Sequence, residues 1–310
     1  MSALRSWRYA LLNPVRHPDA GANAALLGPL TLGVEVTEPA LAAACGLGNL
    51  DPQHGENSSG VAAITAALRW PIPPAGATLV TIRPDPDAFG AMAVLALRAD
   101  GAAPGPAART RIALVARWDA HDHGEWTKWR EANPPLSRPA DARRAAGAPL
   151  AVRALAVFAG DQALTPTARV GCMRRWIGEG LLPADATARA GAAWAATIAA
   201  WNDGEIEIVC GGDPRLVILR SRRPHALRLA YAHAPVVVAA GGARAGRKVT
   251  VAQFEPGWID LAALRADLAA REPGWGGSPT IIGSPQGAPS ALPIELVTDL
   301  ARARLMSRSA

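Results

Sequence analysis

The stretch Val80–Gly90, VTIRPDPDAFG, runs from β-branched residues into two aspartates and then into the small residues that open the apolar run AMAVLALR. β-Branched residues favour strands, whereas a longer run rich in Ala and Leu favours a helix. We therefore predict a strand over Thr78–Ile82 and a helix over Ala88–Arg98. Asp85 and Asp87 lie in the connection, so both carboxylates leave the end of the strand together.

Strands and helices alternate on both sides of this stretch. Leu30–Val36 (LTLGVEV) is predicted as a strand ahead of it, and Arg111–Trp118 (RIALVARW) as a strand behind it. This alternation implies a parallel sheet, and α/β proteins place ligands in the loops at the carboxyl ends of such strands. The strand ending at Trp118 would bring the polar run Asp119–Gly124 to the same edge as the aspartate pair.

The pattern changes near residue 205. Pro183–Trp201 is predicted as a helix in which Trp194 and Trp201, seven residues apart, share one face and pack in a core. Beyond it, short strands and helices surround a hairpin and a glycine-rich loop, Gly274–Gly287. We predict an α/β fold of two domains, with a parallel sheet in the N-terminal domain and a smaller C-terminal α/β domain. The predicted parts are an N-terminal arm over residues 1–28, the parallel-sheet domain over residues 29–204 and the smaller domain over residues 205–310.

Composition narrows the class of protein. The chain of 310 residues has a net charge of +6, and of its 32 basic residues only Lys128 and Lys248 are lysines. Guanidinium groups suit phosphate or carboxylate partners, although arginine-rich, lysine-poor usage is also typical of a GC-rich genome. Three cysteines without CxxC spacing do not fit a disulfide framework or a zinc site, and we expect them to be buried. No apolar run reaches the length of a membrane span and no signal-peptide pattern opens the chain, so we expect a cytoplasmic protein with no membrane partner.

The aspartate pair has two interpretations. In the loop after their strand, Asp85 and Asp87 can converge on a divalent cation, and Mg²⁺ and Mn²⁺ prefer such hard carboxylate oxygens. The alternative is an ordinary surface turn around Pro86 in which the aspartates cap the helix that follows.

A second polar cluster favours the metal site. Asp119, His121, Asp122 and His123 lie within five residues, which is an unusual concentration in a chain with six histidines. His54, in the polar turn DPQH, is a third candidate, either as a ligand or as an acid–base group.

Glycine-rich and basic segments are candidates for binding phosphate. The loop GWGGSPTIIGSPQG could hold a phosphate with its backbone N–H groups, although glycine-rich turns are common. Arg83 lies beside the aspartate pair, where it could bind phosphate or neutralise the acids. Arg247, at the edge of the predicted hairpin, adds positive charge to the same unit as the glycine-rich loop. The candidate substrate-binding residues are Arg83, Arg247, Gly276, Gly277, Ser278 and Ser284.

These segments resemble, in order and spacing over about residues 75–290, the DHH/DHHA1 phosphoesterase superfamily. That superfamily includes nanoRNases, RecJ exonucleases, cyclic-dinucleotide phosphodiesterases and manganese pyrophosphatases. TIRPDPDAFGA looks like its first metal motif, VARWDAHDHG like the strand that ends in its Asp-His-His signature, and GGSPTIIGS like the glycine-rich substrate loop of its DHHA1 domain. Three histidines of the family pattern are replaced: the first falls on Thr81, another on Gly124 and the last on Ser278 or Pro279.

The resemblance implies a DHH-like N-terminal domain with one or two Mn²⁺ or Mg²⁺ ions, and a DHHA1-like C-terminal domain that contacts the substrate across a cleft. The implied ligands are Asp85, Asp87, Asp122 and His123, with Asp119, His121 and His54 as further ligands or acid–base groups.

The implied activity is hydrolysis of a phosphoester or phosphoanhydride in a nucleotide-type substrate, such as a short oligonucleotide or a cyclic dinucleotide, by water that the metal activates. The replaced histidines favour a rival: a degenerate homologue that binds a nucleotide or a protein partner without hydrolysis. An unrelated metallohydrolase using the same loops is a third interpretation. The sequence does not determine the oligomeric state, and a homodimer stays open.

Overall fold

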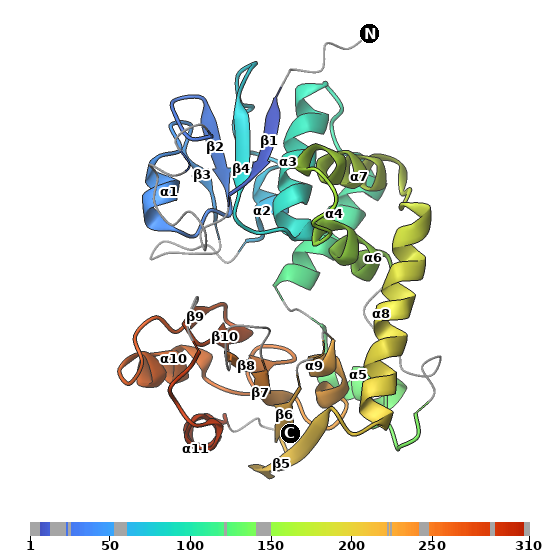
Figure 1. Ribbon diagram of the computed structural model, residues 1–310, viewed down its shortest axis with the longest axis vertical. Coiled ribbons are helices and arrows are strands. Elements are labelled where there is room, and N and C mark those ends of the chain that lie inside the picture. The colour runs from blue at the N-terminus through green and yellow to red at the C-terminus, as the bar shows by residue number, and fades with distance from the viewer. Residues whose placement is uncertain are drawn as a thin grey trace. The chain divides into compact units, whose positions relative to one another are not determined.

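A computed structural model of the chain describes residues 7–12, 23, 26–52, 61–120, 123–140, 150–221, 223, 225–241, 248–285 and 289–306. The chain divides into two compact units, Met1–Ala120 with Pro149–Ala190, and His121–Ala148 with Gly191–Ala310. The second unit thus includes residues 121–148, whereas the sequence pattern predicted one boundary near residue 205. Each unit has its own sheet and hydrophobic core (Figure 1). The protein therefore has the mixed α/β fold that its alternating pattern predicts.

The first unit is built on a four-stranded parallel sheet. Its strands are β1 (Arg8–Leu11), β2 (Thr31–Val34), β3 (Asn49–Leu50) and β4 (Thr78–Thr81), in the spatial order β1-β4-β2-β3. Its helices are α1 (Pro39–Ala43), α2 (Ala63–Ala66), α3 (Pro86–Ala99), α4 (Pro106–Asp119), α6 (Leu150–Ala159), α7 (Pro166–Glu179) and the first part of α8 (Ala184–Asn202). Because every pairing in the sheet is parallel, the carboxyl ends of its strands lie at one edge.

Both faces of this sheet are buried. Successive side chains of β4 point to opposite faces, as in any strand. Leu79 packs with Leu32 and Phe89 in the larger core, while Val80 packs with Leu41 in a smaller one. Continuous apolar strands such as TLVT are typical of parallel sheets that are covered on both sides.

The predicted strand over Arg111–Trp118 is wrong, because Pro106–Asp119 forms the helix α4. A proline in the first turn favours a helix start, and the buried residues Ala108, Ile112 and Val115 repeat at the spacing of one helical face. A short apolar run such as RIALVARW fits either a strand or a buried helix. The helical period becomes visible only when the window extends back to Ala108.

The stretch expected to be an N-terminal arm contains a strand of the sheet. β1 pairs with β4 from Arg8 opposite Thr78 to Leu11 opposite Thr81. Trp7 is buried, and its indole Nε1 donates to the Pro74 carbonyl oxygen at 2.8 Å. The four-residue strand RYAL carries an arginine and sits at the sheet's edge, so it gave no strong strand signal.

The second unit has a six-stranded mixed sheet, in which β6 and β7 pair in parallel and the other neighbours are antiparallel. The strands, in spatial order, are β5 (Glu207–Asp213), β6 (Leu216–Arg220), β7 (Val236–Gly241), β8 (Lys248–Gln253), β10 (Ile281–Gly283) and β9 (Gly276–Gly277). Its helices are α5 (Trp126–Ala132), the last part of α8, α9 (Ala226–Tyr231), α10 (Leu261–Ala269) and α11 (Ile294–Ala303).

Helices cover both faces of this second sheet. Val237 packs in a core with Trp194 and Trp201, which confirms the predicted core face of α8. Val236 lies on the other face, in a core with residues of α10 and α11. Cys210 is exposed, so the prediction that all three cysteines are buried is wrong; it lies on the edge strand β5, which has a neighbour on one side only.

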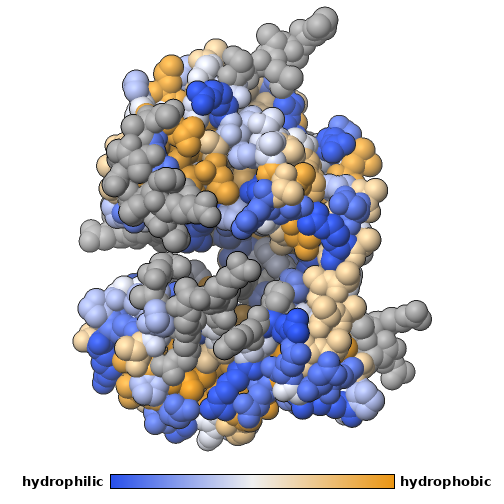
Figure 2. All heavy atoms as spheres, in the orientation of Figure 1, coloured by the Kyte–Doolittle hydropathy of each residue, from blue (hydrophilic) through white to orange (hydrophobic). Residues whose placement is uncertain are grey.

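Hydrophilic side chains are interspersed with apolar ones on the face of each unit that Figure 2 shows. Several arginines pair with acids: Arg174 lies 2.6 Å from Asp100, and Arg215 lies 2.7 Å from Asp213. Within the described ranges, no helix has the length and apolar character needed to cross a membrane.

Candidate metal centre

Acidic side chains collect at the carboxyl edge of the first unit's sheet. Glu35 follows the end of β2, Asp85 and Asp87 follow the end of β4, and Asp119 is the last residue of α4. One carboxylate oxygen from each of Glu35, Asp87 and Asp119 lies within 4.8 Å of the other two. We call these three residues the acid cluster. Carboxylates this close repel one another unless protons or a cation compensate their charge.

Glu35 is the most constrained member of the acid cluster. Its side chain is fully buried, and neither carboxylate oxygen has a hydrogen-bond partner in the part of the chain that the structure describes. Its backbone φ is +52°, in the left-handed region that residues other than glycine seldom occupy. The Glu35 amide donates to the Leu50 carbonyl oxygen at 3.1 Å, which holds this conformation against β3. Such strain is often found at functional sites.

Asp87 joins the acid cluster to helix α2. Its carboxylate is 1% exposed and accepts hydrogen bonds from the backbone amides of Ala63 at 2.7 Å and Ile64 at 3.0 Å. These are the first two residues of α2, whose amides have no partner within their own helix. Each carboxylate oxygen keeps a further lone pair, so this contact is compatible with binding a cation.

Asp85 has the capping role that the sequence left open for the aspartate pair. Its Oδ1 accepts from the backbone amide of Ala88 at 2.9 Å and so caps the N-terminus of α3. Asp87 lies in the first turn of the same helix but caps α2 instead. The two aspartates therefore diverge in their hydrogen bonds while both remain beside Asp119 and Glu35.

Burial and mutual repulsion raise the pKa values of these acids. Burial raises the pKa of Glu35 well above its usual range, and the charges of Asp85, Asp87 and Asp119 raise it further. The pKa of Asp87 is also raised well above its usual range, first by burial and then by Asp119. Burial raises the pKa of Asp85 to about 6, although its hydrogen bond from Ala88 lowers it. A divalent cation would reverse these shifts because it stabilises the ionised forms.

Asp119 reaches the acid cluster from a helix end. The sequence predicted that this residue would meet the aspartate pair from the end of a third strand. The structure brings it there along α4 instead, on the same helical face as the buried Ile112 and Val115. Since residues i, i+3 and i+7 share a helical face, the packing of α4 aims Asp119 inward.

Thr81 and Arg83 form the turn that leads to the aspartates. Thr81, where the family pattern has a histidine, is fully buried, and its hydroxyl accepts from the Arg83 amide at 3.0 Å. The Arg83 charge lowers the pKa values of Glu35 and Asp85, so its guanidinium acts on the same site. Thr81 therefore supports the turn, and Arg83 contributes positive charge.

The structure describes one of the remaining predicted ligands, His123, and not the other three. The ring of His123 packs against Phe254 and Tyr231 in the second unit, with ring centroids 5.0 and 5.6 Å apart. Among the described residues, His123 is absent from the group whose ligand atoms converge. His54, His121, Asp122 and Arg247 lie outside the described residues.

The glycine-rich loop of the second unit contains the short hairpin of β9 and β10. A side chain at Gly277 would lie 2.1 Å from the Ile281 carbonyl oxygen, so strand pairing by itself requires a glycine there. Gly276 is exposed, and the Ser278 hydroxyl lies 3.1 Å from that of Thr280. Ser284 is 2% exposed and its hydroxyl accepts from the Val249 amide at 3.1 Å, which is a contact inside the sheet.

Sequence reasoning missed Glu35. Its signal was an acidic residue inside the apolar, β-branched run LTLGVEV, followed by a second acidic residue, Asp51, directly after β3. Neighbouring parallel strands present their carboxyl ends together. Acids in the connections that leave three adjacent strands are thus a stronger indication of a site than the aspartate pair taken separately.

Comparisons with known proteins establish no family for the chain. No protein-family model matches it, and neither does any curated protein. Among solved structures, the pGpG-specific phosphodiesterase PggH from Vibrio cholerae is similar with a TM-score of 0.40 and 10% sequence identity, over 90% of this chain and 92% of that chain. Function is therefore inferred from the residues of the site.

Proposed function

We propose that this protein is a metal-dependent phosphoesterase that acts on a nucleotide-type substrate, with Mn²⁺ or Mg²⁺ bound at the acid cluster. The observation that carries the proposal is the buried carboxylate of Glu35, whose oxygens have no donor among the described residues. An ionised carboxylate in such surroundings is costly unless a cation pairs with it. Divalent ions that prefer oxygen ligands fit this donor set.

Glu35, Asp87 and Asp119 would hold the ion, with Asp85 beside them. A bound divalent ion supplies Lewis-acid activation of water and neutralises phosphoryl oxygens. Without a cation, the carboxylates of the acid cluster would repel a phosphate group. We therefore expect that both substrate binding and hydrolysis require the metal.

The remaining proposed roles concern the substrate. Arg83, whose charge acts on the acid cluster, would contact a phosphate oxygen. The residues proposed as further ligands or acid–base groups are His54, His121 and Asp122. The further residues proposed to contact substrate are Arg247, Gly276, Gly277 and Ser278.

A binding protein without catalytic activity is the second candidate. Thr81 stands where the family pattern has its first histidine, and its hydroxyl is occupied within the turn. Both oxygens of Asp87 also accept hydrogen bonds from α2. These contacts suit a protein that binds a nucleotide or a partner and has lost hydrolysis.

Calorimetric titration with Mn²⁺ tests the metal centre directly. We expect the wild type to bind Mn²⁺, and Asp119→Asn to bind it at least about tenfold more weakly because a charged ligand is lost. Glu179→Gln is the matched control, since Glu179 is an exposed acid at the end of α7 in the same unit. No binding under saturating Mn²⁺, or equal affinity in Asp119→Asn, would show that the metal proposal is wrong.

Hydrolysis assays then separate the two candidates. The substrates are short oligoribonucleotides, a cyclic dinucleotide and pyrophosphate, each with Mn²⁺ and with a chelator. A phosphoesterase hydrolyses at least one of them only with Mn²⁺, and Asp119→Asn loses this activity while Glu179→Gln keeps it. Metal binding without turnover of any substrate would instead support the non-catalytic candidate.

A further inference from the structure

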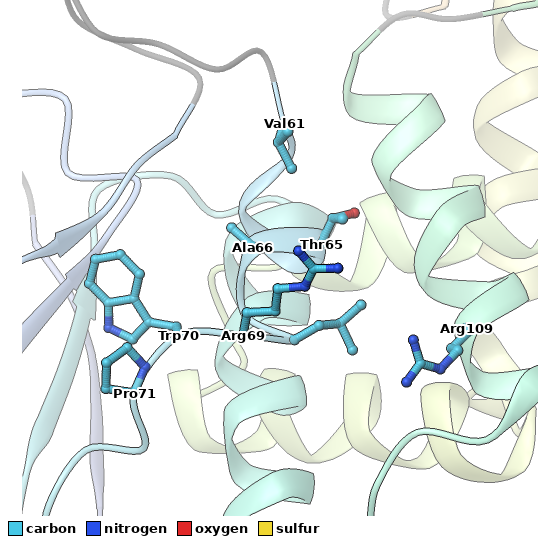
Figure 3. Close-up of a pocket in the computed structure, with 8 residues that line it drawn as sticks. Val61, Thr65, Ala66, Arg69, Trp70, Pro71 and Arg109 are labelled. Carbon is cyan, nitrogen blue, oxygen red and sulfur yellow. The ribbon is translucent and has the colours of Figure 1, made fainter.

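A groove of about 720 Å³ opens on the first unit beside α2 and α4 (Figure 3). Its lining includes Thr65 of α2, the connection that follows α2 and Arg109 of α4. The volume lies within the range of small-molecule sites, roughly 300–1,000 Å³. None of the residues that line the groove is acidic, whereas two of them are arginines.

The two arginines leave their charge available to a ligand. Arg69 is exposed, and its guanidinium makes no hydrogen bond or ion pair with any residue that the structure describes. Arg109 is also exposed; its Nε donates to the Pro104 carbonyl oxygen at 3.0 Å, which leaves its two terminal nitrogens for other acceptors. Figure 3 shows Arg109 reaching from α4 toward the segment that carries Arg69. Two guanidinium groups in the lining of one groove favour a phosphate, which accepts several hydrogen bonds at once.

The rest of the lining is apolar and aromatic. Val61 is 39% exposed, which is high for a large apolar side chain in this chain, and Leu68 and Trp70 are partly buried. Trp70 and Pro71 lie on the side of Arg69 away from Arg109 in Figure 3. An indole surface beside cationic groups suits a ligand that has both a flat ring and a negative charge.

We propose that this groove binds a nucleoside monophosphate, with the phosphate on Arg69 and Arg109 and the base against Trp70. Inorganic phosphate would leave the apolar wall uncovered, and an uncharged nucleoside would leave the guanidinium groups without an acceptor. The groove shares α2 with the acid cluster, because the first amides of α2 bind Asp87 while Thr65 and Ala66 line the groove. The binding claim itself does not depend on the proposed metal.

Calorimetric titration of the full chain without added metal tests the proposal with AMP, adenosine and ribose 5-phosphate as probes. We expect saturable binding of AMP, with adenosine and ribose 5-phosphate each at least about tenfold weaker. Arg69→Gln and Arg109→Gln should each weaken AMP by roughly tenfold or more, since each removes a charge-assisted contact. Arg175→Gln should bind like the wild type, because Arg175 is an exposed arginine on α7 outside the groove.

Three results would overturn the assignment. They are absence of saturable AMP binding, unchanged AMP affinity in both groove variants, and ribose 5-phosphate or adenosine binding as tightly as AMP. Circular dichroism melts of the variants check that they fold, and Arg109→Lys, which retains the charge, should recover part of the affinity. Since no metal is present, failure here would leave the proposed phosphoesterase function untouched.

Discussion

At the scale of one residue, the fold holds Glu35 in an unfavourable conformation and an unfavourable environment. A left-handed backbone at a residue other than glycine costs on the order of 1–3 kcal/mol. Burial of a carboxyl group without hydrogen-bond partners adds to that cost, and three further acids raise its pKa. Among the described residues, none donates a hydrogen bond to the Glu35 carboxylate. A bound cation would offset this cost, which is why we place the metal at Glu35.

Glu35→Gln should therefore stabilise the metal-free protein and weaken its response to metal. Glutamine cannot ionise, so the substitution removes the cost of burying a group that is charged in the unfolded state at pH 8. We therefore expect the melting temperature (Tm) without metal to rise, by roughly 2–4 °C for each kcal/mol gained. The increase of Tm on adding Mn²⁺ should be lost. Thermal melts with and without MnCl₂ measure both effects, with Glu179→Gln as the control. A lower Tm together with an intact Mn²⁺ response would contradict our assignment.

At the scale of the sheet, close contact between β2 and β3 helps to position Glu35. Gly33 of β2 faces Asn49 of β3, and a side chain at Gly33 would lie 2.6 Å from Asn49 Oδ1 and 3.2 Å from Cys45 Sγ. The Asn49 side chain is held in turn by Val36, whose amide and carbonyl both bond it, at 3.3 and 2.9 Å. Asn49 thus secures the segment directly after Glu35, and Gly33 leaves room for it.

Gly33→Ala should consequently lower both stability and metal affinity. The methyl group must displace Asn49, and overpacking of this kind typically costs about 1–3 kcal/mol. Loss of the Asn49 bonds would also release the segment that orients Glu35. Gly171→Ala is the control: Gly171 lies in α7 with open space where its side chain would be, so this change should be neutral or stabilising by about 0.5–1 kcal/mol. Urea unfolding and Mn²⁺ titration measure the two effects, and a Gly33→Ala protein indistinguishable from Gly171→Ala would count against the argument.

At the scale of the whole molecule, the acid cluster makes stability depend on pH and metal together. The pKa values of Glu35, Asp85 and Asp87 are raised on folding, so the folded state binds protons more tightly than the unfolded state. The stability that these groups contribute is present below about pH 4 and is lost as the pH rises through about 6, the pKa of Asp85, and beyond. Asp213, whose pKa is lowered to about 2, changes protonation below this range.

The metal-free protein should accordingly melt at a lower temperature at pH 8 than at pH 5, and saturating Mn²⁺ should raise Tm at pH 8 far more than at pH 5. Protons and the cation compete for the same carboxylates, which is why the metal effect grows as the acids ionise. Melts at both pH values with Mn²⁺ or a chelator provide the measurement, and the Glu35→Gln protein should show a flatter dependence. A metal-free Tm that rises from pH 5 to pH 8 would refute the assigned pKa shifts.

The local sequence pattern was sufficient to predict much of the architecture. β-Branched runs predicted β2 and β4, and the Ala- and Leu-rich run after the aspartate pair predicted α3. A seven-residue spacing predicted the buried face of Trp194 and Trp201. The pattern gave a wrong prediction for α4, because a short apolar run fits both the helical and the strand period. It also gave no prediction for β1, because an edge strand needs few apolar residues. The parallel sheet, and with it a polar edge at its carboxyl ends, followed from the order of strands and helices.

The sequence by itself determined an α/β chain with acids placed after a strand, and it indicated the aspartates and Asp119 as candidates for the site. Only the tertiary structure decided which acids meet. Glu35 reaches Asp87 and Asp119 because β2 pairs with β4 and α4 packs its buried face inward, whereas His123 packs on aromatic rings of the second unit. Distances across a sheet depend on strand order and helix packing, which arise from contacts between residues far apart in the chain. Periodicity along the chain reports only which face a residue occupies.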